Sequence, residues 1–307
     1  MADKILFVRY VSDDMSNNIA EQLPELTDRD VIDARLRGLA EVVDFAESQV
    51  IPVLNGQLNL SGNEEAIFGT YCRFHLCAKG VLSLKDRRFF QLVASAARTG
   101  FELLIDLRSL ADDPSGKAVE MFTAFAAVER FRSAVQLTEF LTKHPNSPSV
   151  PLFDSNHVMT SASDPTRRRD IENRVQRVWG ITKKGKLNWP KNHWSGLNLK
   201  KRASDLGEFY EALYVQLYPF TSWYIHSGSV GYAGIEPEGF GRILGVQADL
   251  LRVVLVEATV IVAKQFHLEK VVEKFHRVID FLKVAPEEYL KEALMKKIEA
   301  TKEKQDT

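Results

Sequence analysis

The chain has only two cysteines in 307 residues and no long uninterrupted apolar run. Its most apolar segment, residues 250–262, is interrupted by Arg252 and Glu257, so it predicts a buried core helix rather than a membrane span. The first residues lack the apolar stretch and small-residue cleavage site of a signal peptide. These features predict a cytoplasmic protein with no membrane partner.

Residues for metal or cofactor chemistry are also sparse. Cys72 and Cys77 lie five apart on one expected helix, where their side chains point in different directions, so no disulfide between them is expected. Two thiols alone cannot complete a structural zinc site. Glu273 and His276 form a single Glu-x-x-His pattern, whereas a di-iron bundle needs two. With no phosphate-binding loop and no Gly-x-Ser-x-Gly sequence, no metal and no cofactor are predicted.

Strand-type alternation is rare, and only residues 5–11 could form a strand. Apolar residues instead recur at threes and fours along most of the chain, with Thr27 or Asp28 as the N-cap of the first long helix. The sequence predicts an all-α, irregular bundle of roughly eight to ten helices. The expected helices cover about 31–45, 64–79, 85–110, 116–142, 165–179, 197–207, 208–225, 242–266 and 286–304.

A loop at residues 145–165 is rich in Pro, Ser, Asn and Asp. It is a possible boundary between two helical layers, within what we predict to be a single domain over residues 1–307. A second loop, beginning at Gly228, carries five of the seventeen glycines of the chain.

Polar residues recur at every fourth position toward the C-terminal end of the chain. This series consists of Tyr210, Tyr214, Tyr218, Ser222 and His226. Neighbours four apart share a helix face, although Pro219 predicts a kink or break. A titratable histidine at a helix end beside a glycine-rich loop is a candidate general acid or base. The alternative is a Ser–His pair that only connects helices.

A second series of fours joins Arg98, Glu102 and Asp106. Arg98 and Glu102 can form an ion pair within one helix. Their neighbours are apolar, which would place the pair on a half-buried face where it needs further hydrogen-bond partners. A solvated helix face is the alternative.

The third feature is a basic segment. Residues 167–202 contain twelve Lys or Arg and two acidic residues, a local charge of +10 in a chain whose net charge is -1. Trp179, Trp189, His193 and Trp194 are interleaved with the cations, a composition that suits phosphates and exposed bases. The segment could instead neutralise acidic helices while its tryptophans anchor loops. The predicted phosphate contacts are Arg167, Arg168, Arg169, Lys183, Lys184, Lys200, Lys201 and Arg202.

Several of these positions together resemble a known family. The matching motifs are Trp194-Ser-Gly196, Tyr210-x3-Tyr214, Ser222-x3-His226 and Arg98-x3-Glu102. The pattern resembles the uncharacterised family called domain of unknown function 5677, over roughly residues 64–231. The resemblance implies an all-helical fold and one cluster made of Arg98, Glu102, Tyr214, Ser222 and His226. It implies no particular activity.

Two functional hypotheses follow. In the first, the protein acts on or binds nucleic acid or a phosphate-bearing ligand. His226 would then be the acid or base, Arg98 would stabilise negative charge, and Glu102 would orient one of them. In the second, the protein is a non-catalytic helical adaptor with the same cluster as a structural network. Both expect Arg98, Glu102, Ser222 and His226 to meet in space. The sequence does not decide whether the protein is an enzyme.

Overall fold

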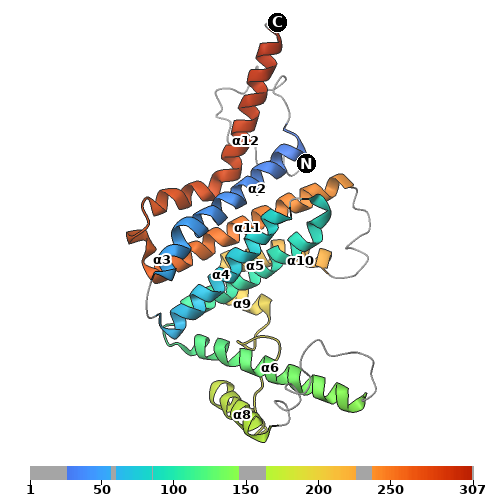
Figure 1. The fold of residues 1–307 in the computed structure, drawn as a ribbon, viewed down its shortest axis with the longest axis vertical. Coiled ribbons are helices and arrows are strands. Elements are labelled where there is room, and N and C mark those ends of the chain that lie inside the picture. The colour runs from blue at the N-terminus through green and yellow to red at the C-terminus, as the bar shows by residue number, and fades with distance from the viewer. Residues whose placement is uncertain (1–25, 57–59, 85, 145–163, 226–236, 306–307) are drawn as a thin grey trace.

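A computed structural model describes residues 26–56, 60–84, 86–144, 164–225 and 237–305 of the chain. Within these ranges every regular element is a helix, and β-structure is limited to one isolated bridge between Ile181 and Leu187 (Figure 1). The predicted all-α bundle is confirmed. The predicted strand at 5–11 lies outside the described residues, as does most of the 145–165 loop.

Most of the helical boundaries follow the predicted ones closely. The α-helices are α2 (Asp28–Phe45), α3 (Ile51–Asn55), α4 (Gly62–Ser83), α5 (Phe90–Ala111), α6 (Lys117–Lys143), α8 (Pro165–Trp179), α9 (Leu199–Asp205), α10 (Glu208–Ile225), α11 (Pro237–Phe266) and α12 (Phe275–Gln305). Three helices differ: α3 was not predicted, α11 begins at Pro237 inside the predicted glycine-rich loop, and α12 begins well before its predicted start at Pro286. The ring of Pro286 is buried against Gly38 of α2, and the carbonyl of Leu282, four residues earlier, accepts a hydrogen bond from Arg252 Nη1 in place of the backbone N–H that proline lacks.

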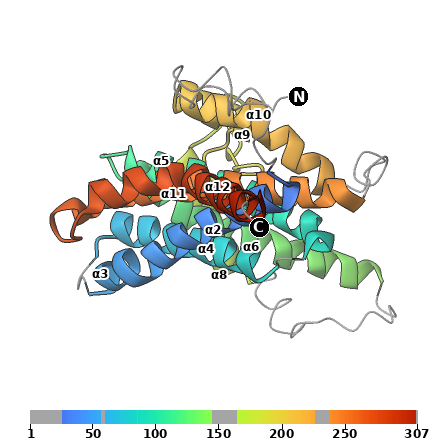
Figure 2. The ribbon, with the colours of Figure 1, turned by 90° about the horizontal axis from the view of Figure 1, so that it is seen from above.

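The core is built around α5 and α11, which lie against each other in the middle of the bundle (Figures 1 and 2). Helices α2 and α4 pack against this pair, and α10 covers α5. Residues 250–262 fall inside α11, where Leu251, Val254 and Leu255 are fully buried. The prediction of a buried core helix there is confirmed. Among the described helices, none combines the length and apolar character needed to cross a membrane.

The start of α2 is fixed by a capping box. Thr27 is the N-cap: its side chain accepts a hydrogen bond from the backbone of Asp30, and the Asp30 carboxylate accepts one from the Thr27 backbone. Asp30 also pairs with Lys297 of α12. The N-terminal end of α2 is therefore tied to the last helix of the chain.

This pairing predicts a specific loss of stability in acid. The hydrogen bonds from Lys297 and Thr27 lower the pKa of Asp30 to about 2, against about 3.9 in an unfolded chain. Because the folded pKa is the lower one, the carboxylate stabilises the fold above the unfolded pKa, and that contribution is lost as pH falls from about 4 to about 2. In urea unfolding between pH 5 and pH 2, the free energy of unfolding should fall less steeply with pH in Lys297→Met than in the unaltered protein. An equal pH dependence of the free energy of unfolding in the two proteins would contradict this prediction.

Helices α6 and α8 form a separate packing unit at the lower end of Figure 1. A second cluster of buried side chains holds them together: Val128, Phe131, Ile171 and Val175. The partly buried side chains of Trp179, Leu187 and Trp189 pack against the same cluster. We call residues 165–191, which comprise α8 and the turn after it, the basic arm.

Candidate functional site

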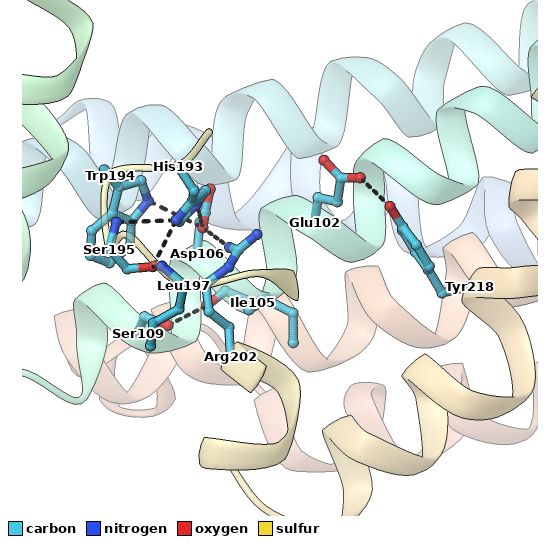
Figure 3. Close-up of polar contacts among 10 residues, drawn as sticks. All are labelled: Glu102, Ile105, Asp106, Ser109, His193, Trp194, Ser195, Leu197, Arg202 and Tyr218. Atoms are coloured by element: carbon cyan, nitrogen blue, oxygen red, sulfur yellow. Dashed lines mark hydrogen bonds and ion pairs between the residues drawn. The ribbon is translucent and has the colours of Figure 1, made fainter. Parts of the chain in front are cut away.

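The second polar series forms a stripe along α5. Arg98, Glu102 and Asp106 follow one another at intervals of about one turn, and each side chain is partly buried. The neighbouring side chains of Phe101 and Ile105 are buried in the core. The stripe faces α9, α10 and the segment before α9, so its charges find partners from later parts of the chain (Figure 3).

At one end of the stripe, Glu102 is shared by two donors. Its Oε1 accepts a hydrogen bond from Arg98 Nε at 3.1 Å and another from the Tyr218 hydroxyl at 3.1 Å. The Arg98 guanidinium also lies 4.8 Å from the centre of the Tyr218 ring, and Tyr214 stacks on that ring. Burial raises the pKa of Tyr218, and the Glu102 charge adds to the rise, so this hydroxyl remains a donor at neutral pH.

The structure thus brings together three of the five predicted cluster residues, Arg98, Glu102 and Tyr214, through Tyr218. The Ser222 hydroxyl donates to the backbone carbonyl of Tyr218 within its own helix. His226 lies outside the described residues, so its meeting with Arg98 and Glu102 stays a prediction. Helix α10 continues through Pro219 and does not break there.

At the other end of the stripe, three donors converge on one carboxylate oxygen. Asp106 Oδ1 accepts from Arg202 Nη1 at 2.7 Å, from His193 Nε2 at 2.9 Å and from Trp194 Nε1 at 3.2 Å (Figure 3). The other ring nitrogen of His193, Nδ1, accepts from the Ser195 backbone N–H. Nε2 must therefore carry the proton that is donated to Asp106. We call Asp106, His193, Trp194 and Arg202 the Asp106 junction.

The junction is nearly closed to water. The side chain of Arg202 is only 8% exposed, and those of Asp106 and His193 are each 16% exposed. Burial lowers the pKa of Arg202, while the charges of Asp106 and Glu102 oppose that shift. The Arg202 Nε makes no hydrogen bond with any described group. Arg202, predicted as a surface phosphate contact, is the one member of that set that the structure buries.

The sequence reasoning did not connect His193 and Arg202 with Asp106, because both were assigned to the basic segment. One signal was available. Asp106 is the third charge in a series of fours on an apolar helix face, and a buried carboxylate requires donors from elsewhere.

The junction holds the chain after the basic arm against the bundle. Trp194 donates to Asp106 through Nε1, and its carbonyl accepts a hydrogen bond from Trp179 Nε1, at the end of α8, at 2.9 Å. The end of α8 is therefore linked to α5 through Trp194. Both ring nitrogens of His193 are engaged by protein groups. The described part of the chain contains no group of three or more His, Cys, Asp or Glu that could hold a metal ion.

The remaining predicted phosphate contacts lie at the surface. Every Lys and Arg in residues 167–202 is exposed, except Arg202. Arg177 pairs with Glu120 of α6 at 3.0 Å, and Lys201 pairs with Asp205. The surface of this segment is therefore strongly positive, and only part of its charge is neutralised by these neighbours.

A tight turn presents two of these cations, Lys183 and Lys184. The Thr182 N–H donates to the Lys186 carbonyl and the Gly185 N–H donates to the Thr182 carbonyl, which closes the turn. Gly185 has a φ of 73°, a left-handed conformation that glycine adopts without strain. The two lysines are thus held at the tip of a defined turn.

The tryptophans of the segment face inward. Trp194 is 5% exposed, and Trp179 and Trp189 pack against the α6–α8 cluster. Arg132 of α6 lies 5.9 Å from the centre of the Trp189 ring. Their contacts are those of residues that anchor the arm, which was the alternative considered from the sequence.

Comparison with known proteins gives one match. A model for a family of unknown function, DUF5677, matches residues 64–236. The matched range includes the stripe on α5, the basic arm and α10. No curated protein and no solved structure matches the chain.

Proposed function

Because the chain belongs to the DUF5677 family of unknown function, we propose its role from its surface: it binds a nucleic acid or another polyanion through the basic arm. The observation that carries the proposal is the exposure of nine cations between Arg167 and Lys191, on α8 and the turn that follows it. Clustered cations on a fixed support bind phosphates largely through the release of counterions.

The arm is a rigid support for these charges. Its inner side consists of Ile171, Val175 and Val178, which are buried, so α8 cannot rotate without exposing apolar surface. The 15 residues of α8 span about 22 Å at the usual helical rise. Arg167, Arg168 and Arg169 lie at one end, and the turn with Lys183 and Lys184 follows the other. A polyanion can contact both ends at once.

The proposal concerns binding and assigns no catalytic step to the Asp106 junction. The donors on Asp106 all come from the protein, and His193 has no ring nitrogen left to exchange a proton with a ligand. An adaptor role with the polar network as a structural element therefore agrees better with the Asp106 junction than acid–base chemistry does. The exposed cations then supply the partner surface.

Fluorescence anisotropy with a labelled 20-base-pair duplex at several salt concentrations tests the proposal. Affinity should fall steeply as salt rises. The triple variant R167Q/R168Q/R169Q should reduce the slope of log K against log salt by up to about 3, since each phosphate contact contributes about 0.9. Its affinity at 0.1 M salt should fall by about tenfold or more.

A matched control removes three exposed cations elsewhere. The variant K264Q/K270Q/R277Q alters the end of α11, the turn after it and the start of α12, away from the arm. It changes net charge equally and should keep the original slope. Equal losses in both variants would assign the binding to net charge alone. No retention on a polyanion column at low salt would remove the proposal altogether.

A further inference from the structure

A groove of about 540 Å³ runs between α2 and α4, on a part of the surface that the basic arm does not reach. This volume is in the range of small-molecule sites. One wall is a stripe of α2 from Asp33 to Asp44, continued by Glu47 of the turn that follows, and the other is the end of α4 with Lys79 and Leu82. Its middle is apolar, formed by Leu36, Ala40, Val43 and Leu82.

The charges of the groove do not balance. Lys79 Nζ bonds both carboxylate oxygens of Glu47, at 2.6 and 2.9 Å. The side chain of Arg37 contacts α12, where it pairs with Glu292 and lies 3.7 Å from the centre of the Tyr289 ring. Both cations of the groove are therefore already partnered.

Two carboxylates remain without a close counterion. Asp44 forms no ion pair with any described residue. Asp33 has only a 3.7 Å contact with Arg29, and both side chains are largely exposed. An exposed pair of this kind contributes little. The groove therefore keeps negative charge toward both of its ends.

A π-helical turn, Ala46–Val50, closes one end of the groove and carries Glu47. Such turns occur frequently at functional sites. Behind Glu47 lies His75 of α4, whose side chain is 6% exposed and whose Nε2 is 4.0 Å from Glu47 Oε2. Burial lowers the pKa of His75, and the ring hydrogen-bonds the backbone of Val43. The Nε2 lies behind Glu47, does not line the groove and makes no hydrogen bond with any described group.

We propose that the groove binds a linear aliphatic polyamine. One ammonium group lies at the end formed by Asp44 and Glu47, and another lies at Asp33. The longest run of methylene groups between them covers the apolar middle at Leu36 and Ala40, and any inner ammonium groups face the open side of the groove. An ammonium group can donate hydrogen bonds to the carboxylates at the ends of the groove, and an aliphatic chain can pack against its apolar middle. Both parts of the ligand are therefore recognised by residues that line the groove.

The spacing of the carboxylates selects the length of the ligand. Asp33 and Asp44 are eleven residues apart on one helix, which corresponds to about 16 Å along its axis. A monoamine engages only one end of the groove. A polyamine reaches both ends, and its affinity is higher because the second ammonium group binds while the first already holds the ligand in place. A bare divalent cation cannot bridge the two ends or cover the apolar middle.

Isothermal titration calorimetry with spermine, in the absence of nucleic acid, tests the inference. Spermine should bind at least about tenfold more tightly than butylamine, and Mg²⁺ at equal charge should not displace it. The variant D33N/D44N should weaken spermine binding by about tenfold, from the loss of two ionic contacts. The control E139Q/E208Q removes two exposed carboxylates outside the groove and should leave binding unchanged.

A second variant separates shape from charge. Ala40→Phe fills the middle of the groove without altering any charge, and it should abolish spermine binding while circular dichroism shows an unchanged helical spectrum. The inference fails if spermine gives no heat at millimolar concentration, if both double variants weaken binding equally, or if Mg²⁺ competes equally. None of these outcomes bears on the basic arm, which is tested with nucleic acid alone.

Discussion

Replacing Asp106 with alanine is expected to destabilise the protein by about 3 kcal/mol, because the change leaves a buried guanidinium without its counterion. The side chain of Arg202 is 8% exposed, and Asp106 is the only described group to which this side chain donates a hydrogen bond. His193 and Trp194 lose the same acceptor at once. Urea unfolding, monitored by circular dichroism, gives the free energy of unfolding directly.

Glu129→Ala is the control for this prediction. Glu129 pairs with Arg132 on the surface of α6, with half of its side chain exposed, and its loss should cost less than about 1 kcal/mol. The double variant D106A/R202M should recover part of the stability lost in Asp106→Ala, since it removes the unpaired buried charge. If Asp106→Ala costs no more than Glu129→Ala, the junction does not stabilise the fold.

The helices could be predicted because apolar residues at threes and fours report directly on a buried face. The same reasoning predicted the half-buried Arg98–Glu102 pair and its need for further partners, and Tyr218 is one of them. It could not identify Tyr218 as the donor, since that contact joins residues 116 positions apart. Pairings between distant segments depend on how the helices pack, which a single sequence does not display.

Arg202 shows most clearly that a single sequence does not reveal which cation of a basic segment is buried. Counted with its neighbours, it is one cation in a strongly basic segment, and the sequence treats it like Lys200 and Lys201. In the structure those two lysines are exposed, and Arg202 is turned inward to Asp106, 96 positions earlier. The π-helical turn at Ala46–Val50 was also not foreseen, because the residues there have an ordinary helical pattern.

Gly100 is packed closely against its neighbours in the core, and Gly100→Leu is expected to cost about 3 kcal/mol or more. The residue lies on α5 where α4 and α11 meet it. A Cβ atom added there would be 2.5 Å from a methyl carbon of Leu251 and 2.9 Å from the ring of Phe74. Both neighbours are fully buried, so neither can move away freely.

The sign of the smaller change, Gly100→Ala, separates packing from helix propensity. Alanine is favoured over glycine inside a helix by about 1 kcal/mol, while overpacking a core typically costs about 1–3 kcal/mol. We expect a net loss of stability at Gly100. At Gly69, an exposed position in α4 with no atom within 4 Å of an added Cβ, the same replacement should stabilise the protein by up to about 1 kcal/mol. Urea midpoints of the two variants should therefore move in opposite directions. If the urea midpoint rose in both variants, α5 would not be packed as tightly against α4 and α11 as the distances at Gly100 require.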